Sequence, residues 1–258
     1  MSGSALLDRV ILLTGGASGI GRACAVAYAR EGAHVVIADV DAEAAEELAG
    51  SLATEGAAIR CDVSRDADVA EAVSRTRSRF GAVHAVHNNA GIANPSKPLH
   101  ETTDEEWDRL FAVNVKGVHL TTRHALMSLR ETGGCILNTA SMVGKIGQGN
   151  HAAYVATKSA IIGLTRAMAL DYAEYGIRVN AVCPAGVWTD MLRSWAADQP
   201  DPAGIEKYLD DIHPLGDCPE ADVIADACVF LLSDRARFVT GCALPVSGGA
   251  ELGYRRSG

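Results

Sequence analysis

Two side chains near the middle of the sequence have the types and the spacing of an acid–base pair. Tyr154 and Lys158 are four residues apart in an Ala-rich stretch, so on a helix they share one face. A free phenol has a pKa of about 10 and is a poor base at neutral pH. A nearby ammonium group favours the phenolate, which can accept a proton from an alcohol. The pair predicts proton transfer at a hydroxyl group, although Tyr-x-x-x-Lys also arises by accident.

A glycine-rich segment near the N-terminus has the pattern of a phosphate-binding turn. The segment Thr14–Gly21 reads TGGASGIG, follows an apolar run and precedes a helical pattern. Glycines allow a tight turn and a close approach to a pyrophosphate, and the next helix directs free N–H groups at it. The alternative is an ordinary strand-to-helix turn. The predicted dinucleotide contacts are Gly15, Ser18, Gly19, Ile20 and Gly21.

Asp39 ends the second apolar run, roughly 20 residues after the turn, where a dinucleotide-binding fold places an acid that binds the adenosine ribose hydroxyls. Its carboxylate would repel a 2′-phosphate, and residues 16–18 contain no Arg or Lys that would attract one. We therefore predict NAD(H) rather than NADP(H) as cofactor. The alternative is a solvated acid at a strand end.

The rest of the sequence supplies the elements that must position these groups. Seven short runs rich in branched apolar residues alternate with longer Ala-rich stretches, and the short runs show little polar–apolar alternation. Such runs are typical of parallel strands covered by helices on both faces. The pattern predicts an α/β fold with a doubly wound, mainly parallel seven-stranded Rossmann sheet, three layers (α/β/α) and a single domain over residues 1–258.

The predicted strands are Val10–Leu13, His34–Ala38, Ala58–Cys61, Val83–His87, Cys135–Asn138, Arg178–Val182 and Ala243–Val246. The predicted helices are Ile20–Arg30, Ala42–Thr54, Asp66–Arg79, Asp104–Arg130, Ala152–Glu174 and Pro219–Leu232. Asp41, Ser64 and Thr103 are expected as N-caps, Pro219 in a first turn, and Gly81 and Gly176 as helix stops. The Pro- and Asp-rich patch Asp198–Pro202 suggests an inserted loop or lid, approximately residues 187–218.

Composition excludes several classes of function. The 258 residues include 23 Lys+Arg against 32 Asp+Glu, a formal net charge of -9, which argues against nucleic-acid and anionic-membrane binding. The seven cysteines are scattered with no two-residue gap, and no histidine pair has zinc-site spacing, so we expect reduced cysteines, no metal and a cytoplasmic location. The N-terminus has neither the basic region of a signal peptide nor an apolar run long enough for a membrane anchor.

Further motifs follow the glycine turn in a fixed order: Asp62-Val63, Asn88-Asn89-Ala90-Gly91, Asn114, Ser141, Tyr154-x-x-x-Lys158 and Pro184-Ala185-Gly186-Val187-Trp188-Thr189. With this ordered set the sequence resembles the short-chain dehydrogenase/reductase family over essentially all 258 residues. Any one motif would be weak, but their order makes accident implausible. The family often has Pro-Gly where this chain has Pro184-Ala185, which bears on the geometry of that loop.

The resemblance implies further contacts to NAD(H). Asp62 and Val63 would contact the adenine, and Asn89, Ala90 and Gly91 would line the cofactor. Val187 and Thr189 would hold the nicotinamide carboxamide, and Tyr154 and Lys158 its ribose. Taken alone, residues 88–91 also fit a turn at a strand end.

The resemblance also implies a catalytic tetrad of Asn114, Ser141, Tyr154 and Lys158. Tyr154 would take the proton from a substrate hydroxyl while hydride leaves the same carbon for the nicotinamide, and would return it in reduction. The bound nicotinamide and Lys158 would both favour its phenolate. Ser141 would hydrogen-bond the substrate oxygen. Asn114 would hold a water that connects Lys158 to solvent. The alternatives are a helix-bending amide at Asn114 and a cap at Ser141.

The substrate is expected between two segments, residues 142–151 and the loop Trp188–Trp195. Lys145, Gln148, His151 and Trp188 are the candidate substrate residues, and they favour a small polar substrate such as a sugar acid or cyclic polyol. Alternatively, Lys145 is solvated and His151 packs beside the tyrosine. Trp188, Met191, Leu192 and Trp195 equally fit an apolar pocket for a steroid-like or aromatic alcohol, or a packing face.

Three other functions share this fold: a 3-oxoacyl-thioester reductase, against which Asp39 argues, a non-catalytic NAD sensor, and a longer-chain epimerase or dehydratase. The resemblance implies a homo-oligomer, with a tetramer favoured and a dimer possible. The tyrosine helix and the helix over Glu106–Arg130 would pack between subunits, and the last helix and strand would build a second interface. The tail Glu251–Gly258 would reach a neighbouring subunit or fray.

Overall fold

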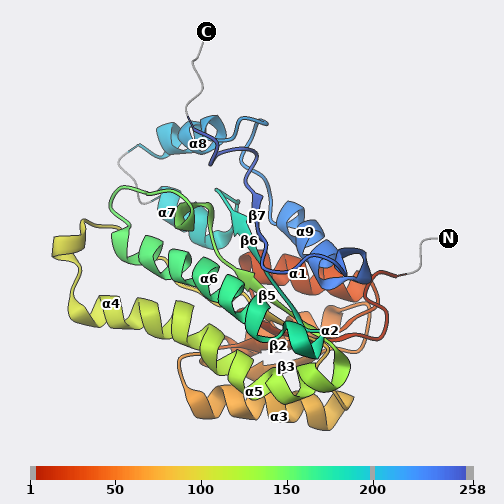
Figure 1. Cartoon of the computed structure of the whole chain (residues 1–258). Helices are drawn as coiled ribbons and strands as arrows, with labels where there is room; N and C mark the ends of the chain where they lie inside the picture. The colour runs from red at the N-terminus through yellow and green to blue at the C-terminus, as the bar shows by residue number, and fades with distance from the viewer. Residues whose placement is uncertain (1–3, 198–200, 254–258) are drawn as a thin grey trace.

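A computed structural model describes residues 4–197 and 201–253. Its centre is a seven-stranded sheet with the order β3-β2-β1-β4-β5-β6-β7 and with every neighbouring pair parallel (Figure 1). The strands are β1 Val10–Thr14, β2 His34–Asp39, β3 Ala57–Arg60, β4 Ala85–Asn88, β5 Cys135–Thr139, β6 Arg178–Pro184 and β7 Ala243–Val246. The predicted fold class is confirmed.

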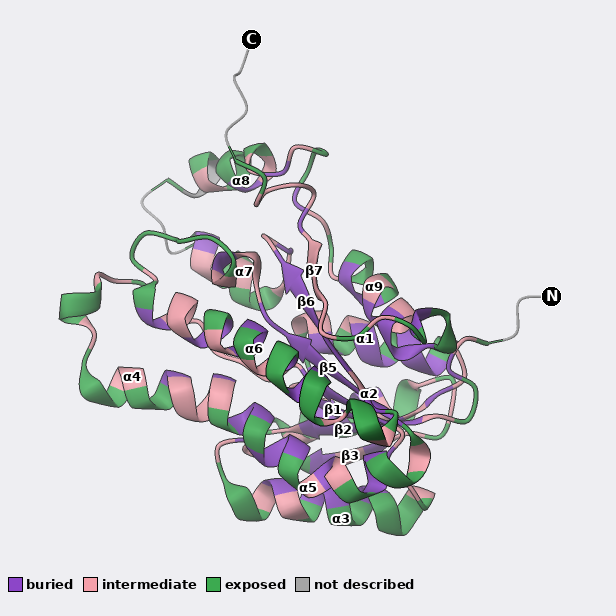
Figure 2. Ribbon diagram, in the orientation of Figure 1, coloured by how far each residue is buried: buried purple, intermediate pink, exposed green. Residues whose placement is uncertain are grey.

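The helices are α1 Gly19–Arg30, α2 Ala42–Ser51, α3 Asp66–Phe80, α4 Asp104–Phe111, α5 Gly117–Thr132, α6 Ala152–Asp171, α7 Asp190–Ala197, α8 Pro202–Asp211 and α9 Asp222–Leu232. One buried core gathers α1, α2 and α9 on one face of the sheet, and a second gathers α3, α5 and α6 on the other. Figure 2 shows the buried residues concentrated on the strands and on the inward helix faces. Because both faces are covered, the central strands carry apolar residues in unbroken runs.

The strand order reverses between β1 and β4, and β1 pairs with both β2 and β4. The connections leave these two strands in opposite directions, which opens a crevice at their carboxyl ends. The sheet therefore brings the ends of β1, β2, β4, β5 and β6 to one edge.

The predicted helix Asp104–Arg130 is wrong in one respect, because a π-helical turn at Ala112–Lys116 separates α4 from α5. Asn114 lies in this turn, and its side chain bonds the backbone of Ile92 on another segment. Hydrophobic periodicity does not report such a local widening, because the helix axis and its apolar face continue across it.

Other boundaries shift by a few residues. Ser64 is not the N-cap of α3, because its N–H and hydroxyl bond Asp62 instead. Pro219 lies before α9, where its carbonyl accepts a hydrogen bond from Trp188 N–H at 2.8 Å. The helices predicted to reach Thr54 and Glu174 end earlier, at Ser51 and Asp171, and a short 3-10 turn follows the second. The caps Asp41 and Thr103 and the stop Gly81 are confirmed, whereas Gly176 ends the 3-10 turn Ala173–Tyr175 and not α6 itself.

The segment expected as a lid contains two short helices, α7 and α8, which lie beyond the carboxyl edge of the sheet (Figure 1). Part of the Pro- and Asp-rich patch, residues 198–200, and the tail from residue 254 lie outside the described residues. Among the described residues, no helix is both long enough and apolar enough to cross a membrane.

Candidate active site

A cavity of about 510 Å³ opens at the carboxyl edge of the sheet. It brings together most of the residues that the sequence analysis singled out. These are Gly15, Ser18, Gly19, Ile20, Asp39, Asp62, Val63, Asn89, Ala90, Gly91, Ser141, Tyr154, Lys158 and Thr189. Gly21, Asn114 and Val187 are buried close by and are not part of its lining.

The turn after β1 can form only because of its glycines. Gly15 has a φ of +62°, and a Cβ there would lie 2.6 Å from Ala90 Cα. A Cβ on Gly21 would lie 2.0 Å from the Gly15 carbonyl oxygen. Gly21 therefore acts by letting α1 begin directly against the turn. The helix N-terminus then faces the cavity, as a pyrophosphate site requires.

Asp39 reaches back from the end of β2 to hold this turn. One carboxylate oxygen accepts a hydrogen bond from Ala17 N–H at 2.9 Å, and the other accepts from Asp41 N–H at 3.1 Å. These bonds fix the carboxylate at the cavity wall, and each oxygen keeps a lone pair for a ligand hydroxyl.

The segment after β4 is tied to the same turn. Asn89 donates from its side-chain amide to the Gly15 carbonyl at 2.8 Å, and its oxygen accepts from the Thr139 hydroxyl at 3.1 Å. After β3, Asp62 accepts hydrogen bonds from Ser64. Burial raises the pKa of Asp62, but the hydrogen bonds from Ser64 lower it by more, so the net shift is downward.

Ser141, Tyr154 and Lys158 share the other end of the cavity. Lys158 is 4% exposed, donates from Nζ to the Thr139 carbonyl at 2.8 Å, and lies 5.6 Å from the centroid of the Tyr154 ring. Burial lowers the pKa of Lys158 to about 8 and raises that of Tyr154 to about 12, although a hydrogen bond between the Ser141 and Tyr154 side chains opposes this rise.

This pKa differs from the expected phenolate. Burial raises the pKa of Tyr154 and the hydrogen bond with Ser141 offsets it only in part, so the tyrosine without a cofactor is a neutral phenol at pH 7. A positive charge brought by a ligand is the remaining influence that would favour its ionisation.

Asn114 is 1% exposed, and both N–H groups and one oxygen lone pair of its amide are engaged. Its oxygen accepts from Ile92 N–H, and its nitrogen donates to the Ile92 carbonyl and to the Thr157 hydroxyl, at 2.9, 2.9 and 3.0 Å. A Cβ on Gly91 would lie 3.4 Å from Asn114 Oδ1 and 3.5 Å from Lys158 Nζ, so these two groups adjoin the same backbone atom. The geometry is that of a structural amide placed beside the lysine.

The four candidate substrate residues lie outside the lining of this cavity. Lys145 and Gln148 are exposed. His151 is half-buried, and its ring centroid is 6.5 Å from that of Tyr154, an edge contact that fits the packing alternative.

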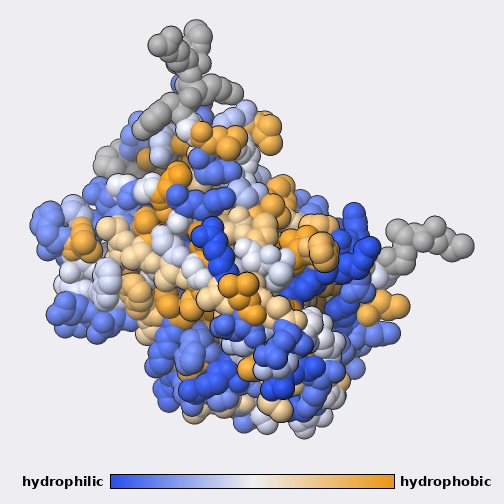
Figure 3. All heavy atoms as spheres, in the orientation of Figure 1, coloured by the Kyte–Doolittle hydropathy of each residue, from blue (hydrophilic) through white to orange (hydrophobic). Residues whose placement is uncertain are grey.

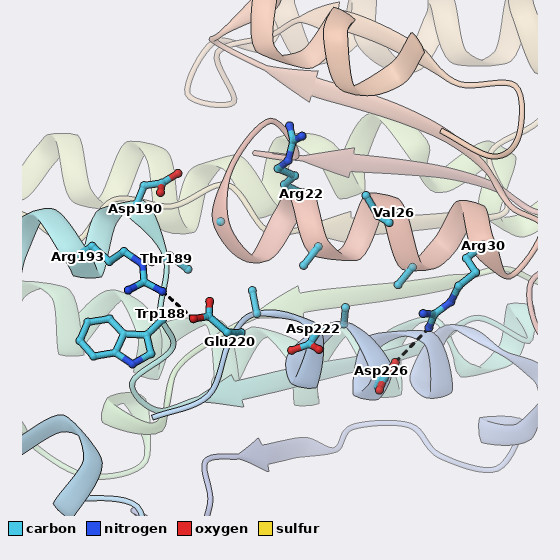
Figure 4. Close-up of a pocket in the computed structure, with 15 residues that line it drawn as sticks. Arg22, Val26, Arg30, Trp188, Thr189, Asp190, Arg193, Glu220, Asp222 and Asp226 are labelled. Carbon is cyan, nitrogen blue, oxygen red and sulfur yellow. Dashed lines mark hydrogen bonds and ion pairs between the residues drawn. The ribbon is translucent and has the colours of Figure 1, made fainter. Parts of the chain in front are cut away.

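Trp188 lines a second cavity of about 470 Å³ between α1 and α9. Figure 4 shows its ring beside Arg193, which pairs with Glu220 at 2.7 Å. The parallel bridge of Trp188 to Glu220 turns the indole to this side, and a pattern along the chain does not show such a pairing.

Sequence reasoning missed several residues that do line the main cavity. Thr139 ends β5, Val113 and Arg109 come from the α4 region, and Ile92 and Ala93 follow β4. Thr139 had a usable signal, because the ends of parallel strands meet at one edge. Met191, weighed as part of an apolar wall, is the member of that group that lines the cavity.

The search for metal sites by spacing also missed a cluster. Within the described residues, Cys24, His87 and Cys228 place their ligand atoms within 4.8 Å of one another, fully buried between α1, β4 and α9. They are far apart in the sequence, so only the fold brings them together.

Comparison with known proteins agrees with this geometry. A family model described as enoyl-(acyl carrier protein) reductase matches residues 15–251. A 2,5-dichloro-2,5-cyclohexadiene-1,4-diol dehydrogenase of Sphingobium indicum is 41% identical, covering 95% of this chain and 98% of that protein. The L-fucose dehydrogenase of Bos taurus is 40% identical, covering 98% of this chain and 93% of that protein.

Among solved structures, a 3-ketoacyl-(acyl-carrier-protein) reductase from Brucella melitensis complexed with NADH has a TM-score of 0.89 and 37% identity, covering 95% of this chain and 99% of that one. Matches of this extent and identity establish the family. The chain belongs to the short-chain dehydrogenase/reductase family and is an alcohol dehydrogenase/reductase that acts on CH–OH groups.

Proposed function

We propose that the protein is an NAD(H)-dependent oxidoreductase that transfers a hydride between nicotinamide and the secondary alcohol or ketone carbon of a small polar substrate. The observation that carries this proposal is one cavity that holds both Asp39 with the phosphate-binding turn and Ser141, Tyr154 and Lys158. A dinucleotide therefore spans from the first set to the second, and the substrate carbon lies beside the second.

The residues of this cavity fit a dinucleotide without a 2′-phosphate. At Gly15 and Gly21 even a Cβ would clash, so their lack of a side chain lets α1 begin directly against the turn with its N-terminus toward the cavity, where a pyrophosphate would bind. The carboxylate of Asp39 is held in place by two backbone N–H groups and offers acceptors to ribose hydroxyls. The cations among the described lining residues are Lys158 at the catalytic end and Arg109 on α4, neither of which belongs to the turn or to β2.

The chain's own residues handle the proton. The bound nicotinamide supplies the hydride acceptor or donor and, when oxidised, a positive charge. Tyr154 accepts the proton of the substrate hydroxyl during oxidation and returns it during reduction. Ser141 holds the substrate oxygen, and Lys158 binds the nicotinamide ribose and favours the phenolate. Asn114 keeps the wall beside Lys158 in place and holds the water that links this lysine to solvent.

The substrate class is supported by the relatives. The two curated relatives are named for a cyclic diol and for a sugar. We therefore propose a cyclic polyol or sugar-acid-like substrate. The helices α7 and α8 would close over it, and Met191 would provide an apolar contact. The alternatives are an apolar cyclic alcohol and a 3-oxoacyl thioester.

A substrate panel with wild-type enzyme and the Tyr154→Phe variant tests this function. Wild type should reduce NAD+ with cyclic diols or aldoses, and Tyr154→Phe should retain NAD+ binding but lose at least about 10²-fold in kcat. Activity confined to steroids or to acyl thioesters would contradict the polar substrate class and would favour the corresponding alternative. Near-normal turnover by Tyr154→Phe would refute the mechanism.

We further propose a homotetramer, with a dimer as the alternative, in the cytoplasm. Figure 3 shows hydrophobic residues over the face that carries α4 and α6, and Phe238 and Leu170 are 102% and 81% exposed.

The seven cysteines are all unpaired and six are buried, which suits a reducing compartment such as the cytoplasm.

A further inference from the structure

A row of buried polar side chains runs beneath the cavity, from α1 to the end of β5. Tyr28 and His87 are both 0% exposed, and the Tyr28 hydroxyl lies 2.9 Å from His87 Nδ1. His87 Nε2 lies 2.9 Å from the Thr139 hydroxyl. Thr139 in turn contacts Asn89, which holds the carbonyl of Gly15. The row thus connects the core to the phosphate-binding turn.

The directions of the hydrogen bonds in this row follow from its last member as far as His87 Nε2, and the bond to Tyr28 follows for a neutral imidazole. The Gly15 carbonyl can only accept, so Asn89 presents its amide nitrogen there and its oxygen to Thr139. The Thr139 hydroxyl must therefore donate to Asn89, which leaves its lone pairs for His87. His87 donates from Nε2–H, and its Nδ1 accepts from the Tyr28 hydroxyl. One neutral tautomer of His87 satisfies the whole row.

The same imidazole belongs to the cluster with Cys24 and Cys228 that has metal-ligand spacing. In the assigned tautomer both ring nitrogens are engaged, one by Tyr28 and one by Thr139. A metal would have to displace the tyrosine and release Thr139 from its orientation. The hydrogen-bonded row therefore accounts for His87 better than a metal site does.

Thr139 also reaches the opposite end of the cavity, because its carbonyl accepts the hydrogen bond of Lys158 Nζ at 2.8 Å. Its side chain contacts the phosphate-binding turn through Asn89, and its backbone carbonyl binds the catalytic lysine. We propose that His87 is a positioning residue, which orients Thr139 and, through Asn89, holds the Gly15 turn ready for the pyrophosphate of the cofactor. This inference rests on the proposed dinucleotide function.

Two amide variants separate the two hydrogen bonds of His87. The amide of His87→Asn reaches only the position of Nδ1, so it keeps the Tyr28 bond and loses the donor to Thr139. The amide of His87→Gln reaches the position of Nε2, so it restores the donor to Thr139 and loses the Tyr28 bond. If His87 has only a structural role, the affinity for the cofactor should fall in each variant in proportion to its loss of thermal stability. If His87 positions Thr139, the affinity should fall only in the variant that loses the hydrogen bond to Thr139.

The experiment measures the Kd of NAD+ and of ADP-ribose, together with Tm, for wild type and both variants. ADP-ribose contains the pyrophosphate and lacks the nicotinamide, so it reports on the turn. We expect His87→Asn to weaken both ligands about 5- to 10-fold and His87→Gln to stay within about twofold of wild type, whatever their Tm values. Equal affinities in wild type and His87→Asn, or affinities that follow Tm, would overturn the inference.

Thr139→Val and Thr139→Ser keep the test decisive should His87→Asn fail to fold. Thr139→Val should weaken both ligands as His87→Asn does, whereas Thr139→Ser retains the hydroxyl and should bind like wild type. The double variant His87→Asn/Thr139→Val should bind both ligands as tightly as Thr139→Val alone, because His87 is proposed to act only through the Thr139 hydroxyl. Wild-type affinity in Thr139→Val, or fully additive effects, would contradict the row. Wild type that binds neither NAD+ nor NADP+ would refute the proposed function and this inference together.

Discussion

Lys158 is expected to lower the stability of the fold that it serves. It is 4% exposed, and burial lowers its pKa from 10.5 to about 8. This drop corresponds to about 3 kcal/mol of destabilisation while the ammonium is charged. Lys158→Met has a similar length without the charge. The substitution also removes the donor to the Thr139 carbonyl, which costs about 1 kcal/mol, so we expect a net stabilisation of about 2 kcal/mol at pH 7.

The stability difference between wild type and Lys158→Met should depend on pH in a defined direction. Below pH 8 the lysine is charged in the folded and unfolded states, so the full destabilisation is present. Between pH 8 and 10.5 the unfolded chain binds more protons than the folded one, and wild type gains stability as the pH rises. The advantage of Lys158→Met should therefore shrink through this window, and above it the variant should be less stable than wild type by about 1 kcal/mol, the cost of the lost donor.

Urea unfolding of wild type and Lys158→Met, without cofactor, at pH 6 to 10.5 measures the difference directly. At pH 7 the unfolding free energy of the variant should be about 2 kcal/mol higher than that of wild type, which corresponds to a Tm about 4–8 °C higher in a thermal scan, and the variant should be inactive. A variant less stable than wild type at pH 7, or a difference that does not change with pH, would refute the assignment of a buried, destabilising ammonium.

Three further variants test other parts of the site. Asp39→Asn should weaken NAD+ about tenfold and reduce the preference for NAD+ over NADP+, because an amide nitrogen cannot accept from a ribose hydroxyl; an unchanged preference in a cofactor titration would remove Asp39 from this role. Asn114→Ala removes three hydrogen bonds, leaves the N–H and carbonyl of Ile92 unpaired, and should lower the unfolding free energy by about 2–4 kcal/mol in urea. Thr157→Val removes the bonds to Asn114 and to the Tyr154 carbonyl and should cost less, about 1–2 kcal/mol; a larger loss in Thr157→Val than in Asn114→Ala would contradict this account. Phe238→Asp should dissociate the oligomer in light scattering if this exposed ring lies at an interface, and an unchanged mass would place the interface elsewhere.

The cofactor end of the site was predictable because its signals are local. A glycine turn between β1 and α1 and an acid at the end of β2 follow from strand patterns and turn chemistry, and the structure places them at one cavity. Tyr154 and Lys158 were equally accessible, because helical spacing alone puts them on one face. The substrate residues could not be predicted in this way. Trp188, for example, forms a parallel bridge with Glu220, a contact between distant residues that the sequence pattern does not show.

The sequence by itself determined the fold class, the order of the motifs and the residue types available for proton transfer, because hydrophobic runs and turn residues act over a few neighbouring positions. Tertiary structure alone decided the protonation states and the supports of the site. Burial raises the pKa of Tyr154 and lowers that of Lys158, and both shifts depend on what packs around these side chains. His87 and Thr139 meet only because β4 and β5 pair in parallel register, a contact between distant segments that no local pattern specifies.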